Sequence, residues 1–98
     1  MKSYGFHRAA RDEVLAIGGF YAAISPELGN RFYDEVDGLV RDICLAPNRY
    51  RIFDPPARRH LGETFPYAVI YLEQPDRIWI VAVMHFKQRP GYWKTRLS

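Results

Sequence analysis

A short C-terminal stretch, HFKQRPGYWKTR at positions 85–96, combines the side chains best suited to act on an anionic partner. It holds one histidine, four cations and three aromatic residues: His85, Lys87, Arg89, Lys94, Arg96, Phe86, Tyr92 and Trp93. Cations and stacking aromatics at a sheet surface can bind RNA. Guanidinium groups can also stabilise phosphoryl charge during RNA cleavage, with histidine or tyrosine in acid–base roles. The simpler alternative is that the aromatic rings pack over the sheet while the cations stay solvated.

A second basic group, ARRH at positions 57–60, adds Arg58, Arg59 and His60 to these candidates. Formal net charge is +3 for the whole chain, but it is unevenly spread. Positions 1–47 hold five cations and seven acidic residues, whereas positions 48–98 hold nine cations and four acidic residues. A basic second half favours an anionic partner, either nucleic acid or an acidic protein segment.

Several other kinds of chemistry lack the residues they need. His7, His60 and His85 lie far apart in the sequence and there is a single cysteine, so no metal-binding spacing is present. No phosphate-binding loop of the GxxxxGK type occurs, and no serine or cysteine stands in a nucleophile-elbow context. The sequence therefore predicts neither a metal nor a cofactor.

The 98 residues fit one small domain, spanning 1–98. The N-terminus meets charge at once and has no apolar leader, and no apolar run is long enough to span a membrane. Cys44 lies beside Val40 and Ile43 in a helical pattern, which predicts a buried thiol rather than a disulfide. A reducing, cytoplasmic location is the expectation.

The first half of the chain predicts a short strand followed by two helices. KSYGF at positions 2–6 alternates like a strand. One apolar helical stripe follows in positions 8–24: Ala10, Val14, Ile17, Tyr21 and Ile24. The pair at Gly18 and Gly19 weakens this helix and suggests a close helix contact or a bend. A second helix is expected to begin with Ser25 as N-cap and Pro26 at its first position.

The second helix carries its own stripe of Phe32, Val36, Leu39 and Ile43, and Pro47 stops it. Beyond it the period becomes that of strands. RRHLGETF, YAVIYLE and RIWIVAVMHF are predicted strands, and RYRIF is either a strand or a connection. The predicted fold class is α+β, with a helical hairpin packed on one face of a mostly antiparallel sheet.

Part of each helical stripe is expected to face one sheet surface, namely Val14, Ile17 and Tyr21 from the first and Phe32, Val36 and Leu39 from the second. That surface is expected to be built around Val69, Tyr71, Ile78, Ile80 and Ala82, or around their opposite-parity neighbours. Pro90 and Gly91 should turn the chain off a strand that ends near Phe86. Tyr92 or Trp93 should then pack against the sheet, while Arg89, Lys94 and Arg96 project outward.

Four segments resemble the ParE/RelE superfamily of type II toxin–antitoxin toxins, nearer its ParE-like branch. They are AARDEV, LGNRFYDEV, RRH…FPYAVIY and VMHFKQRPGYW, in matching order and spacing over nearly the whole chain. The resemblance implies a compact toxin that a cognate antitoxin binds and neutralises as a hetero-oligomer. It also implies two targets: ParE-like members poison DNA gyrase, and RelE-like members cleave messenger RNA on the ribosome.

One position separates these two targets. The RelE-type nucleases that the chain resembles carry an arginine within the strand motif that here reads PYAVIY, and the matching residue is Ala68. Loss of that guanidinium removes a group suited to stabilise phosphate charge. The favoured interpretation is therefore a non-enzymatic gyrase inhibitor whose target-binding residues are Arg58, Arg59, Lys87, Arg89, Tyr92, Trp93, Lys94 and Arg96.

A nuclease remains an alternative. It would use His85, Arg89 and Tyr92, with Arg59 as the substitute cation. The third alternative is a binding module with the toxin fold and neither activity, because fold similarity alone does not choose a target.

Overall fold

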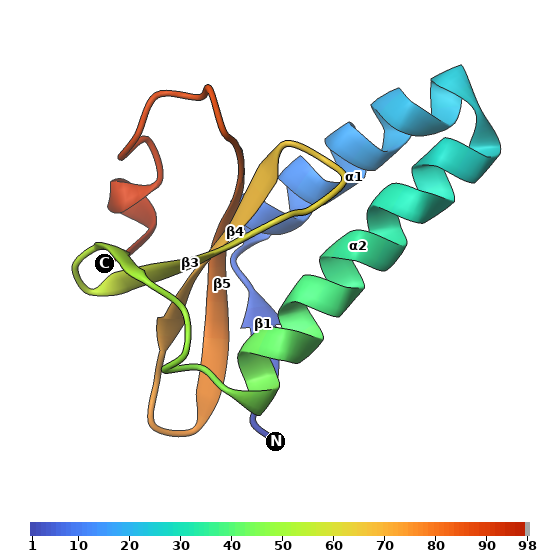
Figure 1. The fold of residues 1–98 in the computed structure, drawn as a ribbon. Helices are drawn as coiled ribbons and strands as arrows, with labels where there is room; N and C mark the ends of the chain where they lie inside the picture. The colour runs from blue at the N-terminus through green and yellow to red at the C-terminus, as the bar shows by residue number, and fades with distance from the viewer. Residues whose placement is uncertain (98) are drawn as a thin grey trace.

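The computed structural model describes residues 1–97 and contains two helices, five strands and a final 3₁₀ turn (Figure 1). In chain order these are β1 (Ser3–Phe6), α1 (Arg8–Ile24), α2 (Pro26–Leu45), β2 (Ile52–Asp54), β3 (Ala57–Leu61), β4 (Tyr67–Glu73), β5 (Arg77–His85) and η1 (Lys94–Leu97). The predicted order of elements is confirmed. The undecided RYRIF segment contributes the short strand β2 at its end.

The five strands form one sheet in the order β1-β5-β4-β3-β2. β1 pairs with β5 in parallel, and every other neighbouring pair is antiparallel, which confirms the mostly antiparallel sheet. Figure 1 shows the two helices side by side on one side of the sheet and the C-terminal segment on the other. The C-terminal segment thus adds a third, partial layer to the α+β fold.

Both helices begin with a side-chain cap. His7 Nδ1 accepts a hydrogen bond from the Ala9 amide at 3.0 Å, and Ser25 Oγ accepts one from the Leu28 amide at 3.1 Å. Such caps satisfy amides that have no partner within the first turn of a helix. Ser25 and Pro26 form the N-terminus of α2, as predicted. Ser25 alone separates the two helices, because α1 ends at Ile24 and α2 begins at Pro26.

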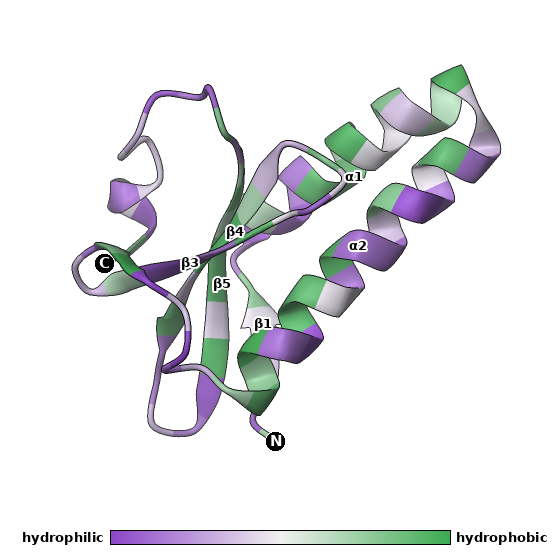
Figure 2. Ribbon diagram, viewed as in Figure 1, coloured by the Kyte–Doolittle hydropathy of each residue, from purple (hydrophilic) through white to green (hydrophobic). Residues whose placement is uncertain are grey.

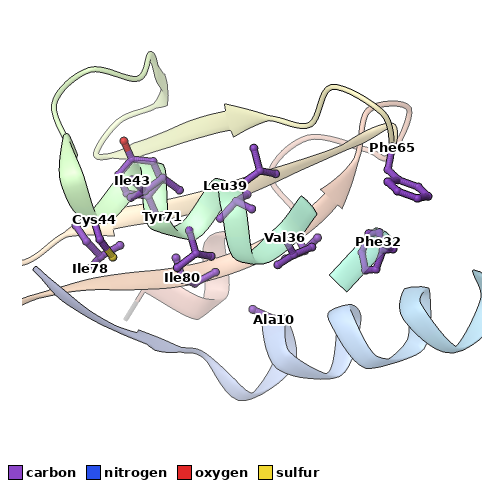
Figure 3. Close-up of a cluster of buried hydrophobic side chains, with 13 residues drawn as sticks. Ala10, Phe32, Val36, Leu39, Ile43, Cys44, Phe65, Tyr71, Ile78 and Ile80 are labelled. Atoms are coloured by element: carbon purple, nitrogen blue, oxygen red, sulfur yellow. The ribbon is translucent and has the colours of Figure 1, made fainter. Parts of the chain in front are cut away.

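The main core lies between the helical hairpin and the sheet (Figure 3). Phe32, Val36, Leu39 and Ile43 from α2 are all buried, as their stripe predicts. Cys44 is also buried, and burial raises the pKa of its thiol. On α1, Val14, Ile17 and Tyr21 pack against this core while partly exposed.

Ile24 continues the spacing of that stripe, but it does not reach the core, because its residue surface is 63% exposed. The helical hairpin extends beyond the edge of the sheet at the α1–α2 turn (Figure 1), so the end of α1 has no strand beneath it. Phe20, one turn earlier on α1, is 62% exposed, whereas the adjacent Tyr21 packs against Phe32 and Phe65. Helical periodicity reports which residues share a face, but not how far the sheet reaches under that face.

Sheet parity is confirmed for Val69, Tyr71, Ile78 and Ile80, which all lie in the core under the helices. The assignment of Ala82 to that face is wrong. Ile70 pairs with Ala82 and Tyr71 pairs with Ile80, so β5 has an extra residue at this point. A β-bulge of this kind shifts the alternation of side chains by one residue. Val83 therefore replaces Ala82 in the helix-side core.

A second buried cluster lies on the opposite face of the sheet, where the C-terminal segment covers it. Its buried members are Ala57, Ala68, Ile70, Val81, Ala82, Met84 and Trp93. Both faces of β4 and β5 are consequently buried, which explains why their sequences are almost continuously apolar. In residues 1–97 no helix has the length and apolar character needed to cross a membrane.

Close packing of the two helices depends on glycine. A Cβ atom added at Gly18 would overlap the ring of Tyr33, which confirms the predicted helix contact, whereas Gly19 faces open space among the described residues. A Cβ atom added at Gly29 would lie 2.7 Å from Ala22 Cβ and 2.9 Å from Ala22 Cα. The second contact involves backbone, so a side-chain rotation cannot relieve it.

Gly29→Ala is expected to lower the free energy of unfolding by about 1–3 kcal/mol, since overpacking must push the two helices apart. Gly38→Ala on the same helix is the matched control, because a Cβ atom there meets nothing within 4 Å among the described residues. It is expected to raise stability by about 0.5–1 kcal/mol through helix propensity. Urea unfolding of the two variants measures both effects, and equal stabilities would contradict a contact at Gly29.

Candidate functional site

The C-terminal segment is held against the sheet by Trp93, which is fully buried. Its ring lies 6.2 Å from the ring of Phe53, measured between centroids, and contacts the second buried cluster. β5 ends at His85, close to the predicted end, and Gly91 has a φ of +88°, a conformation that favours glycine in the predicted turn. The expectation that an aromatic residue anchors the C-terminal segment is therefore confirmed for Trp93.

Glu13 of α1 joins three parts of the fold through its carboxylate. Arg96 donates to both carboxylate oxygens, at 3.0 Å to Oε1 and 3.1 Å to Oε2. The Tyr92 hydroxyl donates to Oε2 at 2.7 Å, and the Val83 amide donates to Oε1 at 3.0 Å. We call these residues, with Val81, the Glu13 network; it fixes the C-terminal segment to α1 and β5.

The Glu13 network also covers the part of β5 that β1 does not reach. β1 pairs with β5 only as far as Ile80. Just beyond this point Arg96 Nη1 donates to the Val81 carbonyl at 3.0 Å, while Glu13 accepts from the Val83 amide. Buried backbone groups must find partners. Two side chains thus take the place of a missing strand next to the β-bulge.

The environment of the network shifts the ionisation of its members. Burial, together with the neighbouring Glu13 carboxylate, raises the pKa of Tyr92 far above its ordinary value. Burial acts to lower the pKa of Arg96, but the hydrogen bonds and charge of Glu13 outweigh it, so the pKa rises. Tyr92 is consequently held as a neutral hydroxyl that donates a hydrogen bond, and Arg96 as a paired cation.

The prediction that Arg96 projects toward a target is wrong in its geometry. Its side chain is only 16% exposed, because its guanidinium turns inward to Glu13 and Val81. Lys94 keeps 58% of its side chain exposed but pairs with Asp54 at 3.0 Å. Lys87 and Arg89 are exposed, and within the described residues neither forms an ion pair. The outward-facing cations of the segment are therefore Lys87, Arg89 and, partly, Lys94.

Arg58 and Arg59 are neighbours in sequence but lie on opposite faces of β3. Arg58 Nη1 donates to the carbonyl of Tyr50 at 2.7 Å and thereby holds the connection between α2 and β2. Arg59 lies over the ring of Phe53, with its Cζ 4.3 Å from the ring centroid. The two guanidinium groups therefore do not form one basic site, although the sequence placed them together.

The four residues expected of a nuclease are distributed around the sheet. His85 lies on the helix side, with its ring 5.1 Å from that of Tyr67, and its Nδ1 accepts from the Lys87 amide. Arg59 lies on the opposite face over Phe53, and Tyr92 is bound to Glu13. Arg89 is exposed on the loop between β5 and η1. Within residues 1–97, no hydrogen bond, ion pair or ring contact joins any two of these four side chains.

A groove on the helix side was not identified from the sequence. It has a volume of about 440 Å³ and lies between β1 and the two helices, lined by Tyr4, Phe6, Arg11, Val14, Leu15, Tyr33, Val36 and Asp37. Tyr4 is 52% exposed and Leu15 is 55% exposed. A signal was present in Leu15, an apolar residue that falls outside the core stripe of α1. We call this hollow the β1–helix groove.

The acidic residues of α2 contact neighbouring elements of the fold. In the part of the chain that is described, no three or more His, Cys, Asp and Glu residues gather so as to hold a metal ion. Acidic residues of α2 include Asp42, which pairs with His60 at 2.9 Å, and Glu35, which accepts from the amides of Thr64 and Phe65. These carboxylates join α2 to β3 and to the loop that follows it.

Comparison with known proteins identifies the family. The family described as ParE toxin of type II toxin–antitoxin system, parDE, matches residues 4–90. A solved structure described as the chromosomal ParDE TA system from P. aeruginosa aligns with a TM-score of 0.76 at 20% sequence identity, covering 87% of this chain and 96% of that chain. No curated protein matches the sequence. The structural likeness shows the shared fold, and the family match runs from within β1 to beyond the end of β5: the chain belongs to the ParE toxin family of type II toxin–antitoxin systems.

Proposed function

We propose that this toxin inhibits DNA gyrase through protein–protein contact and that a cognate antitoxin neutralises it. The proposed contact surface rests on two exposed cations, Lys87 and Arg89, which lie on a segment that is fixed at both ends. His85 ends the strand before them, and buried Trp93 follows them. A loop held in this way presents charge with little loss of conformational entropy on binding.

The arrangement of the candidate nuclease residues favours contact over cleavage. General acid–base catalysis needs the acting groups within hydrogen-bond reach of one substrate. Here the Tyr92 hydroxyl donates a hydrogen bond to Glu13 and the pKa of Tyr92 is strongly raised, so it is poorly placed to exchange its proton with RNA. Ala68, at the position of the nuclease arginine, is buried under the C-terminal segment. Ribosome-dependent cleavage of messenger RNA is therefore the alternative that the assay must test.

The β1–helix groove supports antitoxin binding. It exposes Tyr4 and Leu15 next to β1, a strand at the edge of the sheet. Grooves of this kind accept the apolar face of a helix, and an open strand edge accepts an extended segment. Arg11 and Asp37 among its lining residues offer both signs of charge to set the orientation of the antitoxin. Neutralisation would thus involve the face opposite the C-terminal segment.

Two variants should separate the two surfaces, since one should lose gyrase inhibition and the other antitoxin binding. Arg89→Ala should weaken gyrase inhibition about tenfold or more while leaving antitoxin binding unchanged, since it removes an exposed charge from the target surface. Leu15→Glu should weaken binding of the adjacent reading frame's product while leaving gyrase inhibition unchanged, because it places a charge in the apolar groove. Supercoiling assays and calorimetry with purified toxin measure the two effects.

Arg31→Ala is the matched control, because Arg31 is an exposed cation of α2 outside both surfaces. It should change neither measurement. Translation-coupled cleavage of messenger RNA, assayed with the same preparation, tests the alternative. Cleavage without inhibition of supercoiling would overturn the gyrase proposal. No activity in either assay would favour a binding module with the toxin fold.

A further inference from the structure

Phe86 is an exposed aromatic residue on the loop after β5, which is otherwise rich in hydrophilic side chains. Its residue surface is 47% exposed. The residues that follow it, Lys87, Gln88 and Arg89, are exposed as well, and Figure 2 shows hydrophilic colour along most of this loop. A single exposed apolar side chain is ordinary on a protein surface. Its meaning therefore depends on how the chain holds it.

Four hydrogen bonds fix the backbone around Phe86. The Gln88 amide donates to the His85 carbonyl at 3.0 Å, which closes a β-turn with Phe86 and Lys87 at its centre. The Phe86 amide donates to the Pro66 carbonyl at 2.9 Å and ties the turn to the segment before β4. Two side chains complete the set: His85 Nδ1 accepts from the Lys87 amide at 3.0 Å, and Gln88 Oε1 accepts from the His85 amide at 3.3 Å. The turn is thus formed before any partner binds.

A preformed turn makes an exposed aromatic residue effective in binding. Less conformational entropy is lost on association when the contacting groups are already ordered. Large aromatic side chains near the centre of an interface carry much of its binding energy, and the polar residues around them exclude water. Phe86, followed by the exposed cations Lys87 and Arg89, has this arrangement of an apolar centre with a charged border.

The end of the sheet next to this turn favours a protein partner over a nucleic acid. Leu61, Ala68 and Met84 are neighbours across β3, β4 and β5. Ala68 and Met84 belong to the second buried cluster, and Leu61 is 45% exposed. Surfaces that bind single-stranded nucleic acid place cations and open rings along the path of the strand. Three aliphatic side chains in a row suit an apolar protein surface instead.

We propose that Phe86 anchors this toxin to its target by inserting into an apolar pocket bordered by carboxylates. The inference rests on the proposed function, in which the target is DNA gyrase, and it assigns the residue that provides most of the affinity. Lys87 and Arg89 pair with the bordering carboxylates. His85 and Gln88 hold the turn in position and do not touch the target.

The test compares the affinities of the parent protein and its variants for immobilised gyrase by biolayer interferometry. Phe86→Ala should weaken binding at least about twentyfold, the loss typical of a central aromatic residue. Phe86→Leu should keep most of the affinity, because the pocket recognises apolar volume. Phe20→Ala is the matched control, since Phe20 is 62% exposed on α1, away from the loop, and it should leave the affinity unchanged. Equal affinities of the two alanine variants would overturn the proposal.

Salt separates the anchor from its charged border. Raising the ionic strength screens exposed charges, so the defect of Arg89→Ala should become smaller. Burial of an apolar ring does not depend on that screening, so the defect of Phe86→Ala should persist. Thermal unfolding and antitoxin binding of Phe86→Ala should match those of the parent protein. A Phe86→Ala defect that disappears at high salt would contradict the anchor role.

Growth arrest by the toxin expressed without antitoxin distinguishes this inference from the gyrase assignment. If the parent protein and Phe86→Ala inhibit gyrase equally, the anchor inference fails and the gyrase assignment stands. Growth arrest without an effect on gyrase or messenger RNA, relieved by Phe86→Ala but not by Phe20→Ala, would remove gyrase and keep the anchor for another protein. A parent protein with no activity in any of these assays would overturn both.

Discussion

Trp93→Ala is expected to lower the free energy of unfolding by about 3–5 kcal/mol, the cost of removing a fully buried large aromatic side chain. Trp93 has no exposed surface and is the largest fully buried side chain of the described residues. It is the buried aromatic residue that the C-terminal segment adds to the second cluster, and Tyr92 packs beside it while partly exposed. Denaturant unfolding followed by far-UV circular dichroism measures the loss.

A matched variant separates packing from hydrogen bonding at this site. The indole Nε1 of Trp93 is buried and has no hydrogen-bond partner among the described residues. An unpartnered buried donor contributes a cost rather than a gain, so Trp93→Phe should lose clearly less stability than the alanine variant. Equal losses in the two variants would show that the indole nitrogen has a partner and that the packing account is incomplete.

The same substitution has a functional consequence. Trp93→Ala should release the segment that follows β5, and hydrogen exchange of its amides should become much faster than in the parent protein. If Lys87 and Arg89 act from a fixed loop, gyrase inhibition should fall even at temperatures where the variant remains folded. Full inhibition by a folded variant with a released segment would mean that the fixed loop is not required.

Glu13→Ala is the second large effect that we expect, at about 3–5 kcal/mol, because it leaves three partly buried donor residues without their acceptor. Arg96 is 16% exposed and Glu13 is 20% exposed at the side chain, so water replaces the lost carboxylate poorly. Val83 loses the partner for its amide, and Tyr92 loses the partner for its hydroxyl. Thermal and urea unfolding measure the change.

The neighbouring residue provides the control. Asp12→Ala also removes one carboxylate from α1, but Asp12 is exposed, so its effect should stay within about 0.5 kcal/mol. A double-mutant cycle of Glu13→Ala with Arg96→Ala should be strongly non-additive, since both changes remove the same ion pair. Additive losses would show that the two side chains stabilise the fold independently and that the Glu13 network is not one unit.

The sequence alone determined the elements of this fold and the family to which the chain belongs. The helical stripes, the Ser25 cap, the two long apolar strands and an anchoring aromatic at Tyr92 or Trp93 follow from local preferences and from the period of apolar residues. These features depend on residues close together in the chain. They could therefore be predicted before any tertiary contact was known, and the family motifs lie within them.

Only the tertiary structure decided which charged side chains face solvent. Arg96 and Arg89 belong to the same short basic segment, yet Arg96 turns inward because Glu13, far earlier in the chain, lies beside it. Ala82 changes face because one extra residue in β5 shifts the alternation, and Ile24 is exposed because the sheet ends before α1 does. Arg49, Arg51 and Arg59 converge only because the connection after α2 runs beside β3. Each outcome depends on contacts between distant segments, which local patterns do not encode.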